Sequence, residues 1–499
     1  MLFNSLQFCF FFPIVTLGFF ALPHRYRWAW LLAASCYFYM VFIPAYILIL
    51  CFTIVVDYFS AILIEGSQGA RRKRFLVASI CANVGALATF KYLNFLDANL
   101  AALAAWLHWN YPVKALNIIL PIGLSFHTFQ SMAYTIEVYR GNQRAERHFG
   151  IVALYVMFYP QLVAGPIERP QNMLHQFHEK HTFDYDRSVS GLRLMLWGFF
   201  KKMVIADRFA HLANPVFNHP TDYPGPLLLL ATLAFGYQIY CDFSGYSDIA
   251  IGAARVMGFN FRKNFDRPYS AKSVAEFWHR WHISLSTWFR DYLYIPLGGN
   301  RVAPRRWYGN LLITFLVSGL WHGANWTFVI WGGLHGMYVV VSIWTRNFRG
   351  RLVRWLGLDR VPTFRGALQV ASTFSLASFA WIFFRANTLS NALYIGSHLF
   401  RGYGNTSLTM LSEQLFATLG SNLQLKILFP HLTGFHILAI AAAEVAALEL
   451  IQIAQREGTV EHLLSGRPAW LRWGLYYAMV LNILLLGVFE QSAFIYFQF

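Results

Sequence analysis

The stretch Val317–Val340 reads VSGLWHGANWTFVIWGGLHGMYVV and carries two histidines in a run that is mostly apolar, aromatic or glycine. Such a run is typical of a membrane segment, because a helix needs about 20 predominantly apolar residues to cross the hydrocarbon core. A polar side chain at that depth is costly, so it is usually paired or functional. His322 and His335 are therefore the first candidates for chemistry.

Basic residues flank this stretch on both sides. The segment Phe259–Asn310 holds nine Lys and Arg against three Asp and Glu, and Arg346–Arg354 reads RNFRGRLVR. Positive loops favour the cytoplasmic side, so residues 311–345 are expected to enter the membrane and return. At about 1.5 Å per residue each arm is barely as long as a bilayer is thick. The pattern predicts a hairpin with His322 inside the membrane thickness.

The composition of the whole chain agrees with a membrane protein. Of its 499 residues 57% are hydrophobic and only 13% are charged, whereas a soluble protein of this size needs a larger charged surface. Long continuous apolar runs recur from end to end, which favours helices over a barrel. We predict an all-α polytopic membrane protein with about 11 to 13 membrane-embedded helices. One integral domain over residues 1–499 is the simplest organisation.

Several function classes lack support in the sequence. The net charge of +17 is explained by cytoplasmic loops, and no basic domain with interleaved aromatic residues suggests nucleic acid. A Glu-x-x-His occurs at Glu276–His279, but a di-metal helical site needs more carboxylates, so no metal is expected. Neither a GxSxG elbow nor a glycine-rich phosphate loop is present.

The densest polar region is Arg267–Arg301, RPYSAKSVAEFWHRWHISLSTWFRDYLYIPLGGNR. Tryptophans mixed with arginines and lysines are also found in a plain amphipathic helix at the membrane interface. The alternative is a half-buried segment that lines a cytoplasmic entrance, where cations would meet an anionic co-substrate. The candidate cations are Lys272, Arg280 and Arg290.

Other polar residues in apolar runs have a structural interpretation. His127, Gln130 and Glu137 are expected to make hydrogen bonds between helices. Asp242 and Asp248 are expected either to line a polar channel or, more simply, to pair with loop arginines. The prolines and glycine of YPQLVAGPIERP (Tyr159–Pro170) predict a broken or re-entrant element.

The two histidines of the opening stretch differ in their neighbours. His335 lies beside Gly332, Gly333 and Gly336, which is typical of a histidine packed where two backbones come close. His322 is flanked by Trp321, Gly323 and Ala324, and such small residues leave room for a substrate. On one straight helix the two imidazoles would point to largely opposite faces, so they need not form one site.

Together these motifs resemble the membrane-bound O-acyltransferase family, of the alginate O-acetylation type. The resemblance covers most of the chain and is carried by LPIGLSFHTFQSMAYTIEVYRG, YPQLVAGPIERP, YCDFSGYSDIAIGAARVMGF, NFDRPYSAKSVAEFWHRWHISLSTWFRDYLYIPLGGNR and GLWHGANWTFVIWGGLHG. It implies a ring of helices around a central tunnel that joins a cytoplasmic donor side to an outer funnel. It also implies that His322 of WHG is the catalytic histidine and that His282 of RWHIS is a second catalytic position at the tunnel. One departure is His279, where relatives often have arginine.

The chemistry implied by the resemblance suits these residues. A sugar hydroxyl is a weak nucleophile until a base takes its proton, and a histidine can do this near neutral pH. The expected enzyme moves an acyl group, most simply acetyl from acetyl-CoA, across the bacterial inner membrane for O-acetylation of an exopolysaccharide such as alginate or cellulose. Residues 258–310 would form the cytoplasmic-side segment that leads into a catalytic hairpin at 311–345. No bound cofactor is expected.

The identity of the acceptor and the donor stays open at this point. The acyl group could pass to the polysaccharide directly or to a periplasmic acetyltransferase partner. The donor could instead be an acyl carrier protein, as in teichoic-acid alanylation. A transporter is a further alternative, but transporters usually show paired repeats, and none is visible.

Overall fold

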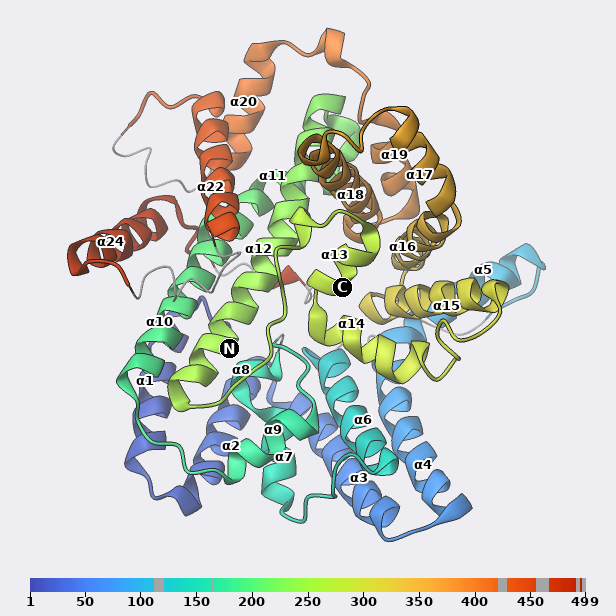
Figure 1. Ribbon diagram of the computed structural model, residues 1–499, viewed down its shortest axis with the longest axis vertical. Helices are drawn as coiled ribbons and strands as arrows, with labels where there is room; N and C mark the ends of the chain where they lie inside the picture. Colours follow the sequence, from blue (N-terminus) through green and yellow to red (C-terminus); the bar gives the residue numbers. More distant parts are fainter. Residues whose placement is uncertain (112–120, 164, 421–428, 455–465, 491–493, 496–499) are drawn as a thin grey trace. The chain divides into compact units, whose positions relative to one another are not determined.

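The computed structural model describes residues 1–111, 121–163, 165–420, 429–454, 466–490 and 494–495, and these residues contain helices and no strand. Seven of the described helices or continuous helical segments are long and apolar enough to cross a membrane: Pro44–Glu65, Gly69–Trp106, Gly225–Met257, Trp326–Trp344, Pro362–Arg385, Gly434–Ala454 and Ala469–Leu486. An all-α polytopic membrane fold is therefore confirmed (Figure 1). The total of 11 to 13 helices and the ring around a tunnel stay predictions.

The chain forms two compact units, and the first comprises Met1–Met195 with Ile249–Arg262. Its helices are α1 (Leu6–Ala21), α2 (His24–Met40), α3 (Ile47–Glu65), α4 (Gly69–Leu87), α5 (Leu93–Trp106), α6 (Leu124–Arg140), α7 (Phe149–Met157), α8 (Tyr159–Leu162), α9 (Pro170–His178) and most of α10 (Tyr185–Phe199). The prediction of a single integral domain is not tested by this division and stays a prediction.

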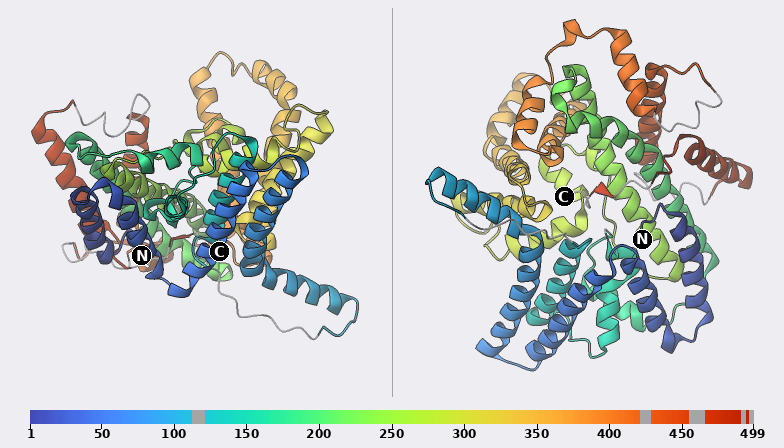
Figure 2. Two further views of the ribbon diagram at one scale, coloured as in Figure 1. Left: turned by 90° about the horizontal axis from the view of Figure 1, so that it is seen from below. Right: turned by 180° about the vertical axis from the view of Figure 1, so that it is seen from behind.

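Helices α3, α4 and α6 of the first unit lie side by side (Figures 1 and 2) and share buried polar groups. Ser79 Oγ and Asn83 Nδ2 of α4 donate to the Asp57 carboxylate of α3 over 2.6 and 2.9 Å. Ser79 also bonds Thr135 of α6 over 2.9 Å. In apolar surroundings such bonds hold helices together because each polar group needs a partner.

The expected hydrogen bonds of Gln130 and Glu137 in α6 are present. Gln130 Nε2 donates to the carbonyl oxygen of Tyr155 in α7 over 2.6 Å, and Glu137 accepts from Gln171 of α9 over 2.6 Å. The proline-rich stretch Tyr159–Pro170 is broken as predicted, because α8 spans only four residues and α9 begins at Pro170.

The second unit comprises Leu196–Asp248 and Lys263–Ile495. Its elements are the end of α10, the π-helix η3 (Phe200–Ala206), α11 (Asp207–Asn218), most of α12 (Gly225–Met257), α13 (Val274–Arg280), α14 (Ile283–Phe289), the π-helix η6 (Arg290–Tyr294), α15 (Pro304–His322), α16 (Trp326–Trp344), α17 (Arg346–Trp355), α18 (Pro362–Arg385), α19 (Leu389–His398), α20 (Leu408–Leu419), α22 (Gly434–Ala454) and α24 (Ala469–Leu486).

Two buried lysines of η3 neutralise the aspartates of α12. Lys202 Nζ lies 2.6 Å from Asp242 and 2.9 Å from Asp207, and Lys201 Nζ lies 2.7 Å from Asp248. The predicted structural pairing is thus confirmed, but the predicted partners were wrong. The partners are the adjacent lysines of the π-helix η3 and not arginines of a loop. A π-helix has a wider turn than an α-helix, so its neighbouring side chains point in different directions from those of an α-helix.

Helices α15 and α16 form the hairpin that the sequence suggested, although it begins at Pro304 rather than at 311. Two glycines let the backbones touch. A Cβ on Gly319 would lie 2.3 Å from the carbonyl oxygen of Phe328, and a Cβ on Gly332 would lie 2.3 Å from that of Phe315. The turn is fixed by Asn325, whose side chain accepts from Thr327 N over 3.1 Å as the N-cap of α16.

Candidate active site

His322 is the last residue of α15 and is 4% exposed. Its ring meets Trp321 and Trp331 edge-on with centroids 4.9 Å apart, and Phe384 of α18 at 5.4 Å. Glycine is needed at position 323, directly after His322, because a Cβ there would lie 2.1 Å from the Phe328 ring. The imidazole therefore sits among aromatic rings directly before the hairpin turn.

His335 lies on the facing helix α16 and is fully buried. Its Nδ1 accepts a hydrogen bond of 3.2 Å from the indole Nε1 of Trp278, so in the neutral ring the proton is on Nε2. Its ring also meets Trp331 with centroids 5.1 Å apart. The fold thus brings the two histidines of the opening stretch to the same tryptophan, which a single straight helix could not do.

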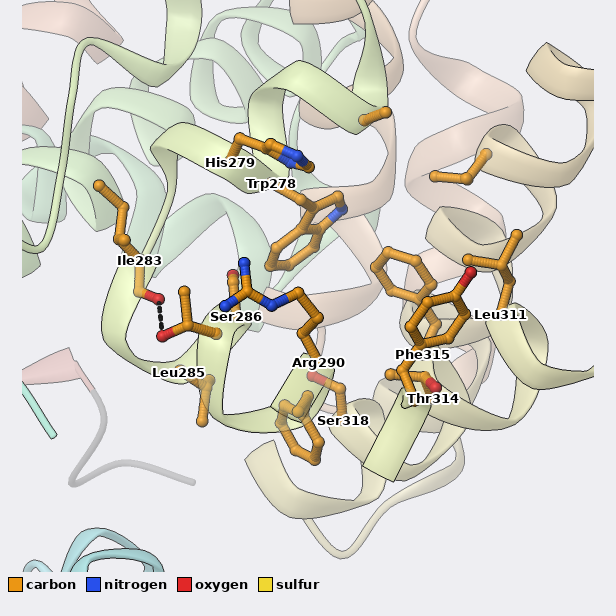
Figure 3. Close-up of a pocket in the computed structure, with 15 residues that line it drawn as sticks. Trp278, His279, Ile283, Leu285, Ser286, Arg290, Leu311, Thr314, Phe315 and Ser318 are labelled. Carbon is orange, nitrogen blue, oxygen red and sulfur yellow. Dashed lines mark hydrogen bonds between the residues drawn. The ribbon is translucent and has the colours of Figure 1, made fainter. Parts of the chain in front are cut away.

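A cavity of about 490 Å³ lies among α13, α14, η6, α15 and α16 of the second unit (Figure 3). Its walls are largely apolar. Figure 3 shows the side chain of Arg290 reaching into the middle of this group, below Trp278 and His279. Ser318, one turn before His322 on α15, also lines the cavity. The lining residues are Ala275, Trp278, His279, Ile283, Leu285, Ser286, Thr287, Phe289, Arg290, Tyr294, Leu311, Thr314, Phe315, Ser318 and Val339.

The three candidate cations occupy different surroundings. Arg290 is 59% exposed, lines the cavity and lies 2.8 Å from Asp291. Arg280 lies outside the lining, where Glu276 pairs with it over 2.6 Å and Ser270 accepts from it over 3.1 Å. Lys272 is exposed and also lies outside the lining. That these three residues bind the co-substrate stays a prediction. His279 also lines the cavity and becomes a fourth candidate ligand.

His282 is fully buried between α13 and α14 and adopts the left-handed backbone conformation, with φ of 42°. Its Nδ1 lies 3.2 Å from Oδ1 of Asn264. That amide oxygen also accepts from the backbone N–H of Ser284 over 3.2 Å, which identifies it as the oxygen. His282 Nδ1 is therefore the donor, and Nε2 carries the lone pair.

Burial lowers the pKa of His282 to about 3, because the charged ring would lose its water. The imidazole is thus neutral at physiological pH. A neutral ring with its lone pair on Nε2 can accept a hydrogen bond from a substrate group.

A chain of ring contacts connects the two candidate catalytic histidines within the second unit. Neighbouring centroids along it are 5.0 to 6.3 Å apart. The chain runs through His282, Phe265, Trp281, Trp381, Phe384 and His322.

The tryptophans of the polar segment are buried rather than interfacial. Trp278, Trp281 and Trp288 all lie inside the unit, which favours the half-buried segment over the plain amphipathic helix. Their spacing alone did not reveal this, because their partners Trp331, His335 and Trp381 come from α16 and α18. Among the described residues, no group of three or more His, Cys, Asp or Glu is placed to hold a metal ion.

The fold and the site define a multi-pass membrane protein with buried histidines beside an apolar cavity. Residues 148–384, which include His282, His322 and His335, match the sequence profile of MBOAT, the membrane-bound O-acyltransferase family. The chain is 40% identical to the probable alginate O-acetylase AlgI of Pseudomonas aeruginosa, over 83% of this chain and 77% of that protein. It is 36% identical to the probable alginate O-acetylase AlgI of Pseudomonas putida over the full length of both.

A third relative is the peptidoglycan O-acetyltransferase of Helicobacter pylori, 36% identical over 83% of this chain and 82% of that protein. The chain therefore belongs to the membrane-bound O-acyltransferase family, and it is a multi-pass membrane enzyme that transfers acyl groups to oxygen. The resemblance drawn from the motifs is confirmed.

Proposed function

We propose that this enzyme takes an acetyl group from acetyl-CoA on the cytoplasmic side and passes it across the bacterial inner membrane for O-acetylation of an exopolysaccharide such as alginate or cellulose. The names of the relatives support acetyl as the group, since alginate and peptidoglycan are both O-acetylated polymers. The immediate acceptor is either the polysaccharide or a periplasmic acetyltransferase partner.

His322 is proposed as the general base, and its position carries the proposal. The imidazole is buried at the turn of the hairpin, one helical turn beyond Ser318 in the cavity wall. An acceptor hydroxyl held against it would lose its proton to the ring as its oxygen attacks the thioester carbonyl. The carbon–sulfur bond then breaks, and the proton held by His322 leaves with the CoA thiol.

His282 is proposed as the second catalytic imidazole. Because Asn264 fixes the proton on Nδ1, the lone pair lies on Nε2, which can accept a hydrogen bond from a reacting hydroxyl or thiol. Its low pKa keeps it neutral throughout the reaction.

The cavity is proposed to hold the arm of the acyl donor. An apolar wall suits the pantetheine chain, and the partly exposed guanidinium of Arg290 suits a phosphate. Arg280 is a weaker candidate because Glu276 already neutralises it. Replacing Arg290 by Gln should raise KM for acetyl-CoA by roughly tenfold or more with little change in kcat.

The test uses protein purified into nanodiscs with radiolabelled acetyl-CoA. Wild type is compared with His322→Ala and with His398→Gln, which changes a histidine of α19 that does not line the cavity. Thioester cleavage that depends on His322 but not on His398, with label appearing on added polysaccharide or partner, supports the proposal. Equal thioester cleavage by all three proteins would show that His322 is not the general base. If label is transferred only from a charged acyl carrier protein, that protein and not acetyl-CoA is the donor.

A further inference from the structure

Helix α17 (Arg346–Trp355) follows the hairpin directly, and none of its residues is buried. Its sequence RNFRGRLVRW contains four arginines and no acidic residue. The proposed transfer reaction uses no part of it.

The helix has one apolar and one basic side. At about 100° per residue, Phe348, Leu352 and Trp355 fall within an arc of about 60°. The exposed fractions of Phe348, Leu352 and Trp355 are 66%, 39% and 81%, so the described residues leave most of this arc open. Arg351 borders this arc, about 40° from Trp355, Arg354 lies about 60° further round the helix, and Arg346 lies opposite the arc.

The fourth arginine fastens α17 to the hairpin. Arg349 Nη2 donates to the carbonyl oxygen of Ser342 in α16 over 2.6 Å and to its hydroxyl over 3.0 Å. The other three arginines are exposed and have no hydrogen bond or ion pair within the described residues. Arg349 thus fixes α17 to α16, while the other three arginines and the apolar arc remain exposed.

We propose that α17 lies on the membrane surface and binds anionic phospholipid headgroups through Arg346, Arg351 and Arg354. The apolar arc enters the boundary between headgroups and acyl chains, as in other amphipathic surface helices. Basic side chains next to such an arc are attracted to the negative surface of the cytoplasmic leaflet. An acidic soluble protein would match the arginines but would leave Phe348 and Trp355 in water.

The experiment measures backbone hydrogen exchange of residues 346–355 in the full-length protein, in nanodiscs of phosphatidylcholine alone or with added phosphatidylglycerol. The basic-face variant is Arg346→Gln/Arg351→Gln/Arg354→Gln, which keeps Arg349 and its bonds to Ser342. The matched control is Arg301→Gln/Arg305→Gln/Arg306→Gln, which removes the same charge from exposed positions near the start of α15.

In wild type and in the control, phosphatidylglycerol should slow exchange of α17 by roughly tenfold or more. The difference should shrink at high salt, because screening weakens attraction between surface charges. The basic-face variant should exchange equally in both lipids. Equal exchange in wild type would overturn the proposal. The proposal would also be overturned if added soluble acyl carrier protein slowed exchange of α17 and phosphatidylglycerol did not. Acyl transfer is not measured, so the result is independent of the proposed function.

Discussion

The indole N–H of Trp278 donates a 3.2 Å hydrogen bond to Nδ1 of His335, so a wall of the cavity is tied to the hairpin that carries His322. Trp331 contacts the rings of both histidines and completes the connection. We therefore predict a positioning role for His335, in which it acts through Trp278 and Trp331.

The first prediction concerns this hydrogen bond. His335→Asn keeps an acceptor near the position of Nδ1, whereas His335→Leu, whose side chain has the shape of Asn, does not. We expect His335→Leu to lower kcat/KM for acetyl-CoA by roughly tenfold and His335→Asn to recover most of it. Trp278→Phe should have a similar effect, and the double variant Trp278→Phe/His335→Leu should be no worse than either single one. Additive losses would show that the two side chains act independently.

The second prediction concerns His282, whose left-handed backbone Asn tolerates better than most residues. His282→Asn should fold with a near-normal melting temperature yet lose about 100-fold or more in kcat. His282→Leu should lose a further 1–2 kcal/mol or so of stability from the backbone alone. Because the pKa of His282 is already lowered to about 3, the residual activity of the Asn variant should keep the pH profile of the wild type above pH 5 or so. Full activity of His282→Asn would remove this residue from the site.

A third prediction concerns Glu168, which is buried in the first unit and accepts hydrogen bonds from Asn172 and from the backbone N–H of Arg262. Burial raises its pKa from 4.5 to about 7, against the opposing effect of these bonds. Between these two pH values the folded protein binds more protons than the unfolded chain. Stability should therefore fall as pH rises through this window, by up to about 3 kcal/mol.

Glu168→Gln should flatten this dependence, since the amide does not titrate and still accepts a hydrogen bond. Thermal unfolding in detergent across the window measures the slope. Glu179→Gln, which changes an exposed carboxylate of the same segment, is the control and should leave the slope unchanged. An unchanged slope in Glu168→Gln would show that another group titrates.

A fourth prediction concerns the lysines of η3. Lys202→Met leaves Asp242 and Asp207 buried without their cation, which should cost about 3–5 kcal/mol. Lys263→Met breaks an exposed pair with Asp266 and should cost less than about 1 kcal/mol. The shift in the unfolding midpoint measures both. Equal shifts would mean that the η3 pairs are as weak as surface pairs.

The membrane fold and the hairpin could be predicted because local patterns define them. Apolar runs identified the spans, and the basic flanks of residues 311–345 identified a chain that turns back. The break at Tyr159–Pro170 followed from its prolines. The pairing of Arg280 with Glu276 was also within reach, because residues four apart on a helix are neighbours.

Contacts between distant segments were not accessible from one sequence. Trp278 and His335 are 57 residues apart, and nothing local distinguishes their bond from other pairs of tryptophan and histidine. The lysine partners of Asp242 and Asp248 depend on the packing of η3 against α12. For the same reason the sequence could not show that Arg290, rather than Arg280 or Lys272, lines the cavity.

The backbones of α15 and α16 touch at Gly319 and Gly332, and this contact affects how the hairpin responds to changes in temperature. Bilayers thin on warming and thicken on cooling, and helices joined only through side chains can slide to follow them. The two arms of this hairpin interlock along the main chain, so they shift as one piece. The contacts of His322 with Trp321 and Trp331, both in the hairpin, should thus remain the same when a cell remodels its lipids.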